Sequence, residues 1–176
     1  MKGELEGQMP VLKKQNLRNA DYANRSVTDL FTKDQLDKAI VKQVNYSSSC
    51  IAYNDGNRNF KLQNLPQAIQ FSSVKAILPI DVNNDGITDL VVAGNEFNFQ
   101  PQLGRLDAST GDVLINDGKG NFKVPGQSYT GLGLHGQVRH LVMLKRLNKT
   151  TVLFLQNDEL PLLYQLQNKI NTAVRK

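Results

Sequence analysis

An internal repeat constrains the fold of this 176-residue chain more than any other feature. Residues 51–62 read IAYNDGNRNFKL and residues 113–124 read VLINDGKGNFKV, and they align without a gap at an offset of 116 − 54 = 62 residues. In each copy Asn-Asp-Gly lies between two strand-like runs, where Asp-Gly suits the positive φ angles of a hairpin turn. The repeat therefore predicts two equivalent β-hairpins, with Phe60 and Phe122 packed inward.

Each predicted hairpin is followed by a second pair of apolar, strand-like runs. VKAILPI and ITDLVVAG follow the first copy at 74–80 and 87–94, and VRHLVML and TTVLFLQ follow the second at 138–144 and 150–156. Four-stranded units that recur at about 60 residues are typical of β-propeller blades. We therefore expect a mainly β fold with N-terminal helices, in which two blade-like antiparallel units form a partial β-propeller. Two blades cannot close a ring.

The N-terminal part of the chain carries helix signals. SVTD at 26–29 and TKDQ at 32–35 fit capping boxes, in which the first and fourth residues exchange hydrogen bonds. Short helices, or one broken helix, are expected within residues 11–42. The expected organisation is a helical segment at 1–42, a first blade-like repeat with a long insertion at 43–111, and a second, degenerate repeat at 112–176.

Composition excludes several classes of protein. No apolar run approaches the roughly 18 residues of a membrane-spanning helix, and the start MKGELEGQMP lacks the apolar core of a signal peptide. We expect neither segment in this chain, although a polar start of this kind is also typical of a piece excised from a longer protein. Cys50 is the only cysteine, which excludes an intramolecular disulfide and a cysteine-based zinc cluster.

Oxygen-bearing side chains recur at alternate positions in the stretch IDVNNDGITDL, residues 80–90. Calcium binds six to eight oxygen atoms, and ligands at positions 1, 3, 5, 7 and 9 of a loop provide most of them. A glycine after the third ligand permits the sharp bend, and the apolar residue at position 12 excludes an EF-hand. The alternative is a simple acidic turn. The predicted calcium ligands are the side chains of Asp81, Asn83, Asp85 and Asp89 and the carbonyl of Ile87.

These features resemble the FG-GAP/VCBS repeat proteins. DVNNDGITD resembles the family's calcium loop, Asp-x-Asp/Asn-x-Asp-Gly-x-x-Asp, and both Asn-Asp-Gly hairpins are similar to its Asn-x-Gly-x-Gly-x-Phe turn. ADYAN, DLFTKDQL, AGN and GRLDASTG are similar to the C-terminal part of large secreted bacterial members, of the ASPIC/UnbV-associated, cartilage-acidic-protein-like group. The second copy reads KRLNKTTVL at 145–153 in place of the loop, so one metal site is implied.

The resemblance implies a non-enzymatic calcium-binding repeat module of an extracellular or cell-envelope adhesion or recognition protein. Calcium is the one cofactor it implies, and no residue is expected to be catalytic. The implied partners are the remaining propeller blades of a parent chain and an extracellular protein or glycan ligand. The long loop at 95–111 is the expected recognition segment, because loops commonly carry binding residues.

Nucleic-acid binding is one alternative function. From Lys119 onward the chain has nine basic residues against two acidic ones, a balance that can attract phosphate. The basic residues lie on strand-like segments without interleaved aromatic residues, so we expect a solvated face and no nucleic-acid partner. Binding to arbitrary RNA or DNA with a steep salt dependence would support the alternative.

Catalysis is the other alternative. An apolar strand that ends in Asp-x-Asp is typical of haloacid-dehalogenase phosphatases, but the second carboxylate is replaced by Asn83, which cannot transfer protons. A hydrolase would need a base near Asp81, for which His135 is the candidate. GLGLHG at 131–136 matches Gly-x-Gly-x-x-Gly but leads into a strand, so it lacks the context of a dinucleotide site.

Overall fold

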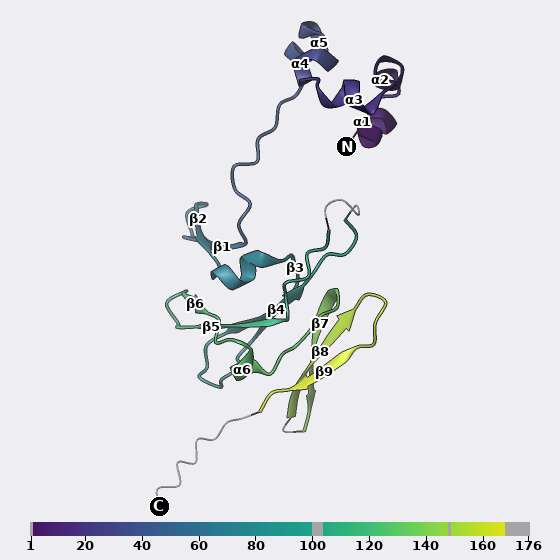
Figure 1. Ribbon diagram of the computed structural model, residues 1–176. Coiled ribbons are helices and arrows are strands. Elements are labelled where there is room, and N and C mark those ends of the chain that lie inside the picture. Colours follow the sequence, from purple (N-terminus) through teal and green to yellow (C-terminus); the bar gives the residue numbers. More distant parts are fainter. Residues whose placement is uncertain (1, 100–103, 148, 168–176) are drawn as a thin grey trace, which may run out of the picture. The chain divides into compact units, whose positions relative to one another are not determined.

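The computed structural model describes residues 2–99, 104–147 and 149–167, and the chain divides into two compact units, residues 1–46 and 47–176 (Figure 1). The first unit contains short helices, and the second contains three antiparallel sheets. The prediction of a mainly β fold with N-terminal helices is confirmed. Each helix among the described residues is too short or too polar to cross a membrane.

Short helices with local caps build the first unit. Both predicted capping boxes form: the Asp29 carboxylate accepts bonds from the Ser26 N–H at 2.8 Å and Oγ at 2.7 Å, and the Thr32 N–H donates to Gln35 Oε1 at 2.9 Å. The bonds from Ser26 lower the pKa of Asp29. The helices are α1 (Lys2–Gln8), which precedes the predicted helical range, α2 (Val11–Gln15), α3 (Asn19–Ala23), α4 (Val27–Leu30) and α5 (Lys33–Asp37).

In the second unit, hydrogen-bonded strands are consecutive along the chain, so each sheet is a meander (Figure 1). The first sheet pairs β1 (Cys50–Asn54) with β2 (Phe60–Asn64). The middle sheet contains β3 (Val74–Ile80), β4 (Asp89–Gly94), β5 (Asp112–Asn116) and β6 (Phe122–Lys123). The third contains β7 (Val138–Arg146), β8 (Lys149–Gln156) and β9 (Leu162–Gln165). A 3-10 helix, η1 (Gln67–Phe71), precedes β3, and a short helix, α6 (Gln127–Thr130), precedes β7.

The two repeat copies form the same hairpin turn. In each, the Asn side chain accepts a bond from the Gly N–H, at 2.9 Å in the turn of β1–β2 and 3.0 Å in that of β5–β6. The carboxylates of Asp55 and Asp117 each accept bonds from the backbone N–H groups two and four residues further on. Bonds to Asn57 and Asn59 lower the pKa of Asp55, and bonds to Asn121 and Lys119 lower that of Asp117. The predicted equivalence of the two hairpins is confirmed.

The second halves of the repeat are also alike. The pairing of β3 with β4 shifts register between Val74 and Ala76, and that of β7 with β8 shifts between Val138 and His140. After each pair, the next N–H bonds back to the residue that precedes the first strand. These bonds are Asn95 N to Ser73 O at 3.1 Å and Asn157 N to Gln137 O at 2.9 Å.

The strand order differs from the predicted grouping of strands. β4 pairs with β5 through Leu90 with Leu114 and Val91 with Val113. One sheet therefore combines the end of the first sequence repeat with the beginning of the second. The boundary between residues 111 and 112 divides the sequence repeat, and the middle sheet runs across it.

The middle sheet has core residues on both faces, although Lys75, Ile77 and Pro79 of its edge strand β3 are exposed. One face packs against the third sheet in a first core cluster, and the other packs against η1 and the segment before it in a second cluster. Buried members of the first cluster are Ala76, Val91, Ala93, Val113, Leu132, Leu134, Val138, Val152 and Phe154. Those of the second are Ile69, Val92 and Leu114.

The prediction that both repeat phenylalanines are buried is wrong for Phe60. Phe122 packs against the second core cluster, whereas the Phe60 side chain is 62% exposed. The two phenylalanines differ because they lie at different places in the stack of sheets. Ile69 of η1 lies in the cluster against which Phe122 packs. Among the described residues, neither core cluster includes Phe60.

We predict that Phe154→Ala destabilises the β unit strongly. The Phe154 side chain is 1% exposed and meets Tyr164 edge to face at 5.4 Å between ring centroids. Truncating a buried aromatic side chain costs about 3–5 kcal/mol of unfolding free energy, which urea denaturation measures. Leu160→Ala is the control, because Leu160 is 84% exposed and should change stability by less than about 0.5 kcal/mol. Similar losses in both variants would contradict this placement of the core.

Candidate metal centre

The predicted calcium loop connects β3 to β4 through two residues with positive φ. Asn84 has φ 60° and Gly86 has φ 83°. Glycine adopts this region without steric cost, and asparagine tolerates it better than most residues. These two positions turn the backbone so that its N–H groups point toward the side chains that precede them.

Three of the predicted ligands lie together in this loop. Asp81 Oδ1 and Oδ2 accept bonds from the N–H groups of Asp85, at 3.2 Å, and Gly86, at 2.9 Å. Asn83 Oδ1 accepts a bond from the same Asp85 N–H at 3.1 Å, and Asn83 Nδ2 donates to Asp85 Oδ2 at 2.8 Å. Asp85 Oδ1 accepts a bond from the Ile87 N–H at 2.8 Å. The structure thus brings Asp81, Asn83 and Asp85 into direct contact.

Asp89 holds the base of the loop. Its side chain is fully buried, and it begins β4, opposite Ile80. Oδ2 accepts a bond from the Val82 N–H at 3.0 Å, and Oδ1 accepts one from the Asn116 N–H at 2.8 Å. One carboxylate therefore joins the start of the loop, β4 and the end of β5.

Asn116 is a residue of this site that the sequence analysis assigned only to a hairpin turn. Besides its backbone bond to Asp89, its Nδ2 donates to the Thr88 carbonyl at 3.0 Å. The side chain of Ile87 also lies near the same turn, where a Cβ on Gly118 would meet Ile87 Cδ1 at 3.0 Å. The Asn-Asp-Gly motif signalled the turn, but only the pairing of β4 with β5 reveals that the turn supports the loop.

The residues of the loop fit a hard cation by kind of ligand. Among the described residues, no group of three or more His, Cys, Asp or Glu side chains lies where it could hold a metal ion. The three predicted carboxylate ligands, Asp81, Asp85 and Asp89, therefore do not form such a group. The other two predicted ligands are of another kind, the Asn83 amide oxygen and the Ile87 carbonyl. A carboxylate oxygen that accepts one N–H retains another lone pair, so Asp81 and Asp85 keep acceptor capacity. An all-oxygen set of this composition suits calcium.

The second copy has no equivalent loop. Ile80 pairs with Asp89 across the β3–β4 connection, whereas the corresponding Leu144 pairs with Thr151 and β7 continues to Arg146. The β7–β8 connection is shorter, and a threonine occupies the place of the buried carboxylate. His135, the candidate base of a hydrolase, is exposed, and no hydrogen bond within the described part of the chain joins it to Asp81.

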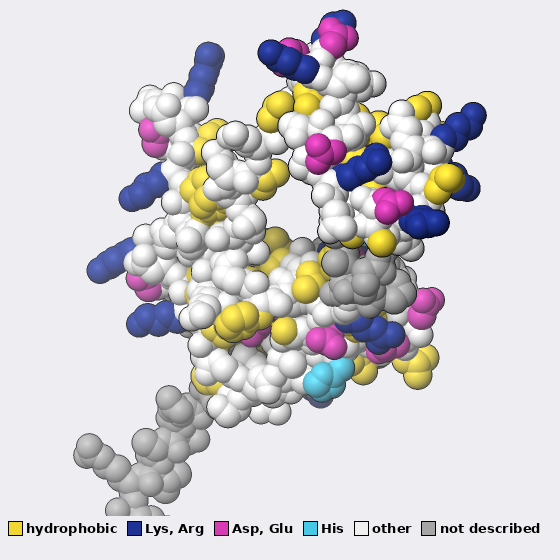
Figure 2. Space-filling view, turned by 45° about the horizontal axis from the view of Figure 1, so that its top comes forward, with side chains coloured by type: hydrophobic (Ala, Val, Ile, Leu, Met, Phe, Trp, Pro, Cys, Tyr) yellow, Lys and Arg dark blue, Asp and Glu magenta, His cyan; other side chains and the backbone are white. Residues whose placement is uncertain are grey.

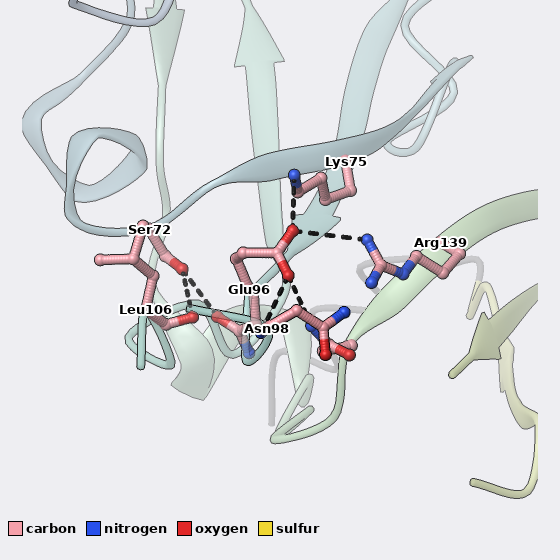
Figure 3. Close-up of polar contacts among 8 residues, drawn as sticks. Ser72, Lys75, Glu96, Asn98, Leu106 and Arg139 are labelled. Carbon is pink, nitrogen blue, oxygen red and sulfur yellow. Dashed lines mark hydrogen bonds and ion pairs between the residues drawn. The ribbon is translucent and has the colours of Figure 1, made fainter. Parts of the chain in front are cut away.

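A second polar cluster joins the middle and third sheets (Figure 3). The Glu96 carboxylate contacts Lys75 Nζ of β3 at 2.8 Å and Arg139 of β7 at 3.6 Å. It also accepts bonds from the Asn98 N–H and from Gln137 Nε2, each at 3.1 Å. The hydrogen bond from Lys75 is the largest of the contributions that lower the pKa of Glu96 to about 2.

Beside this cluster, Asn95 fixes the base of the long loop at 95–111. Asn95 is fully buried, and its Oδ1 accepts bonds from Ser72 Oγ at 2.8 Å and the Ser109 N–H at 3.0 Å. Its Nδ2 donates to the Ser109 carbonyl at 2.9 Å and the Gly136 carbonyl at 3.2 Å. Ser72 Oγ also bonds the Leu106 carbonyl at 3.1 Å (Figure 3).

Comparison with models of known protein families, with curated proteins and with solved structures finds no match to this chain. The resemblance to FG-GAP/VCBS repeats therefore stays a prediction from the sequence motifs.

We predict that Asp89→Asn destabilises the calcium-free protein. The carboxylate now accepts hydrogen bonds from the N–H groups of Val82 and Asn116. In the variant the amide nitrogen would face one of these two N–H groups, and two donors cannot bond each other. An unsatisfied buried donor costs about 1–3 kcal/mol, measured by urea unfolding in chelator. Asp85→Asn is the matched control. The Asp85 side chain is exposed and keeps one acceptor oxygen after the substitution, so the expected loss of unfolding free energy is under about 0.5 kcal/mol. Equal losses would show that Asp89 has no special structural role.

We predict that Glu96 contributes stability that depends on pH. The ion pair and hydrogen bonds depress its pKa from 4.5 to about 2, so the folded state favours the ionised form. The difference in unfolding free energy between wild type and Glu96→Gln should be fully present above pH 4.5 and should be lost as the pH falls toward 2. Lys75→Met, which removes the main partner, should reduce this dependence. A difference that stays constant over this range would refute the prediction.

Proposed function

We propose that this chain is a non-enzymatic, calcium-stabilised β-propeller repeat module, part of an extracellular or cell-envelope recognition protein. The observation that carries the proposal is the direct contact of Asp81, Asn83 and Asp85 in a loop whose base the buried Asp89 holds. Asp81, Asn83, Asp85, Asp89 and the Ile87 carbonyl are the proposed ligands. Waters or neighbouring groups complete the six to eight oxygen atoms that calcium binds.

Charge gives the ion its structural role. Asp81, Asp85 and Asp89 carry a combined formal charge of −3, and a divalent cation reduces it to −1. The Asn83 and Asp85 side chains are exposed, so the calcium-free loop is held mainly by local hydrogen bonds. Bound calcium would fix the connection between β3 and β4, which form the edge and second strand of the middle sheet.

The stack of sheets supports the propeller part of the proposal. The middle sheet is a four-stranded antiparallel meander, the form of a propeller blade, and it packs face to face against the third sheet. In a propeller module, the remaining blades of a parent chain cover the terminal sheets. An extracellular protein or glycan ligand binds the loops, of which the segment 95–111 is the longest between strands of one sheet.

The two alternative functions gain no support from the site. On the face shown in Figure 2, Lys and Arg side chains are interspersed with Asp and Glu side chains, and no continuous basic surface forms there. Nucleic-acid binding and hydrolysis stay alternatives to the module proposal. The absence of catalysis stays a prediction.

We predict that calcium raises the melting temperature of the chelator-stripped protein. A ligand that binds only the native state adds RT ln(1 + [L]/Kd) to the unfolding free energy, about 2.7 kcal/mol at a hundredfold excess over Kd. Magnesium should raise the melting temperature less, because it prefers a strict octahedral shell and loses water reluctantly. Differential scanning calorimetry measures the shift, and isothermal titration calorimetry measures the binding.

Two substitutions serve as matched tests of the ligands. Asp85→Ala should abolish the calcium-dependent shift, because it removes a ligand on the exposed side of the loop. Lys145→Ala, in the shorter connection of the second copy, should leave the shift unchanged. If well-folded protein binds no calcium up to millimolar concentration, the loop is an acidic turn and the metal proposal fails.

A further inference from the structure

A cleft opens between the first sheet and the middle sheet of the β unit. Its volume is about 330 Å³, within the range of small-ligand sites, roughly 300–1,000 Å³. Three carboxamide side chains line it together with apolar ones, and none of the described residues that line it is charged. The carboxamides are those of Gln63, Asn64 and Asn121, and the apolar side chains include Ile51, Leu65 and Phe122. We call this space the Gln63 cleft.

The Gly120 carbonyl joins the two sheets beside the cleft. It accepts hydrogen bonds from Tyr53 Oη at 2.6 Å and from Gln63 Nε2 at 3.1 Å. Gly120 has φ 86°, and a Cβ at this position would meet the Tyr53 hydroxyl at 3.1 Å. A glycine therefore lets the first sheet approach the middle sheet closely, and the contact fixes the shape of the cleft before a ligand binds.

The equivalent space between the middle and third sheets is filled. Ile51 corresponds to Val113 in the second copy, and Val113 is 5% exposed in the first core cluster. Gln63 corresponds to Pro125, so the first copy has a polar side chain where the second has an apolar one. The cleft is thus particular to the first copy, and it lies between two layers of this chain, where a further blade of a parent chain does not reach.

The lining of the cleft suits a neutral ligand that donates hydrogen bonds. A charged ligand would lose hydration without gaining a partner of opposite charge. Gln63 Oε1 makes no hydrogen bond within the described part of the chain, and Asn121 Oδ1 accepts a long one, at 3.5 Å, from Gln63 Nε2. Both oxygens can accept from hydroxyl groups. Leu65 and Phe122 offer apolar surface beside them.

A sugar ring combines these properties, because its hydroxyl groups donate hydrogen bonds while its C–H groups form an apolar face. We propose that the Gln63 cleft binds one neutral sugar unit of a glycan. Asn64 and Asn121 are exposed, so the cleft opens to solvent and the rest of the glycan can extend from it. The inference rests on the glycan part of the proposed function, adds a site outside the loop at 95–111, and does not depend on calcium.

NMR titration of the full, isotope-labelled chain with monosaccharides tests the site. Glucose, galactose, mannose and N-acetylglucosamine are the neutral probes, and glucuronic acid is the charged comparison. At least one neutral sugar should bind with a Kd on the order of a millimolar, because a single ring offers few contacts. Glucuronic acid should bind more weakly. The chemical shift changes should centre on the side-chain amides of Gln63 and Asn121 and on Phe122.

Gln63→Leu should weaken the binding of the neutral sugar by about tenfold or more, because it removes the acceptor oxygen. Gln165→Leu is the matched control, since Gln165 is an exposed glutamine of β9 outside the cleft. It should bind like wild type. Circular dichroism checks folding, and the shift changes of the wild type locate the site even where Gln63→Leu does not fold.

A wild type that binds none of the neutral sugars overturns the proposal. Binding that Gln63→Leu retains, or that shifts the amides of the loop at 95–111 instead, overturns the cleft while it supports a glycan ligand. Tighter binding of glucuronic acid contradicts the neutral assignment. The calcium-dependent melting temperature tests the module by itself, so a failure of the cleft and a failure of the proposed function are distinguishable.

Discussion

The carboxylate of Asp89 is the interaction on which the candidate site depends. It is fully buried and accepts one N–H from the start of the loop and one from the end of β5. A buried carboxylate is costly unless hydrogen bonds satisfy it, so these two donors have to stay in place. The loop is therefore tied to the pairing of β4 with β5, and any change in that pairing would also move Asp81, Asn83 and Asp85.

The layered packing of the sheets explains the character of the strands. β4 lies inside the middle sheet with both faces covered, so Leu90, Val91, Val92 and Ala93 form a continuous apolar run without alternation. β7 lies at the edge of the third sheet, where one face meets the core and the other is exposed. The lysine and arginine at its end, Lys145 and Arg146, suit an edge strand because charge discourages uncontrolled pairing.

Local patterns predicted local structure well. Asn-Asp-Gly predicted both hairpin turns, and Ser-x-x-Asp and Thr-x-x-Gln predicted both capping boxes, because the interacting groups are a few residues apart. The pairing of β4 with β5 was not predicted, since it spans the long loop and depends on burial of both faces. For the same reason the sequence did not predict the exposure of Phe60 or the bonds from Asn116 to the site. Identical motifs have different surroundings when one copy lies inside the stack and the other lies at its end.

The base of the loop at 95–111 is closed independently of its tip. Asn95 bonds Ser72, Ser109 and Gly136, and Glu96 and Leu106 exchange backbone bonds at 2.8 and 2.9 Å. These bonds hold the two ends of the loop together. Lengthening the loop between them is inexpensive, because each doubling of loop length raises the free-energy cost of closure by only about 0.6 kcal/mol. A lineage that carries this fold is free to lengthen or replace the loop while both sheets keep their packing, so recognition can diverge faster than architecture.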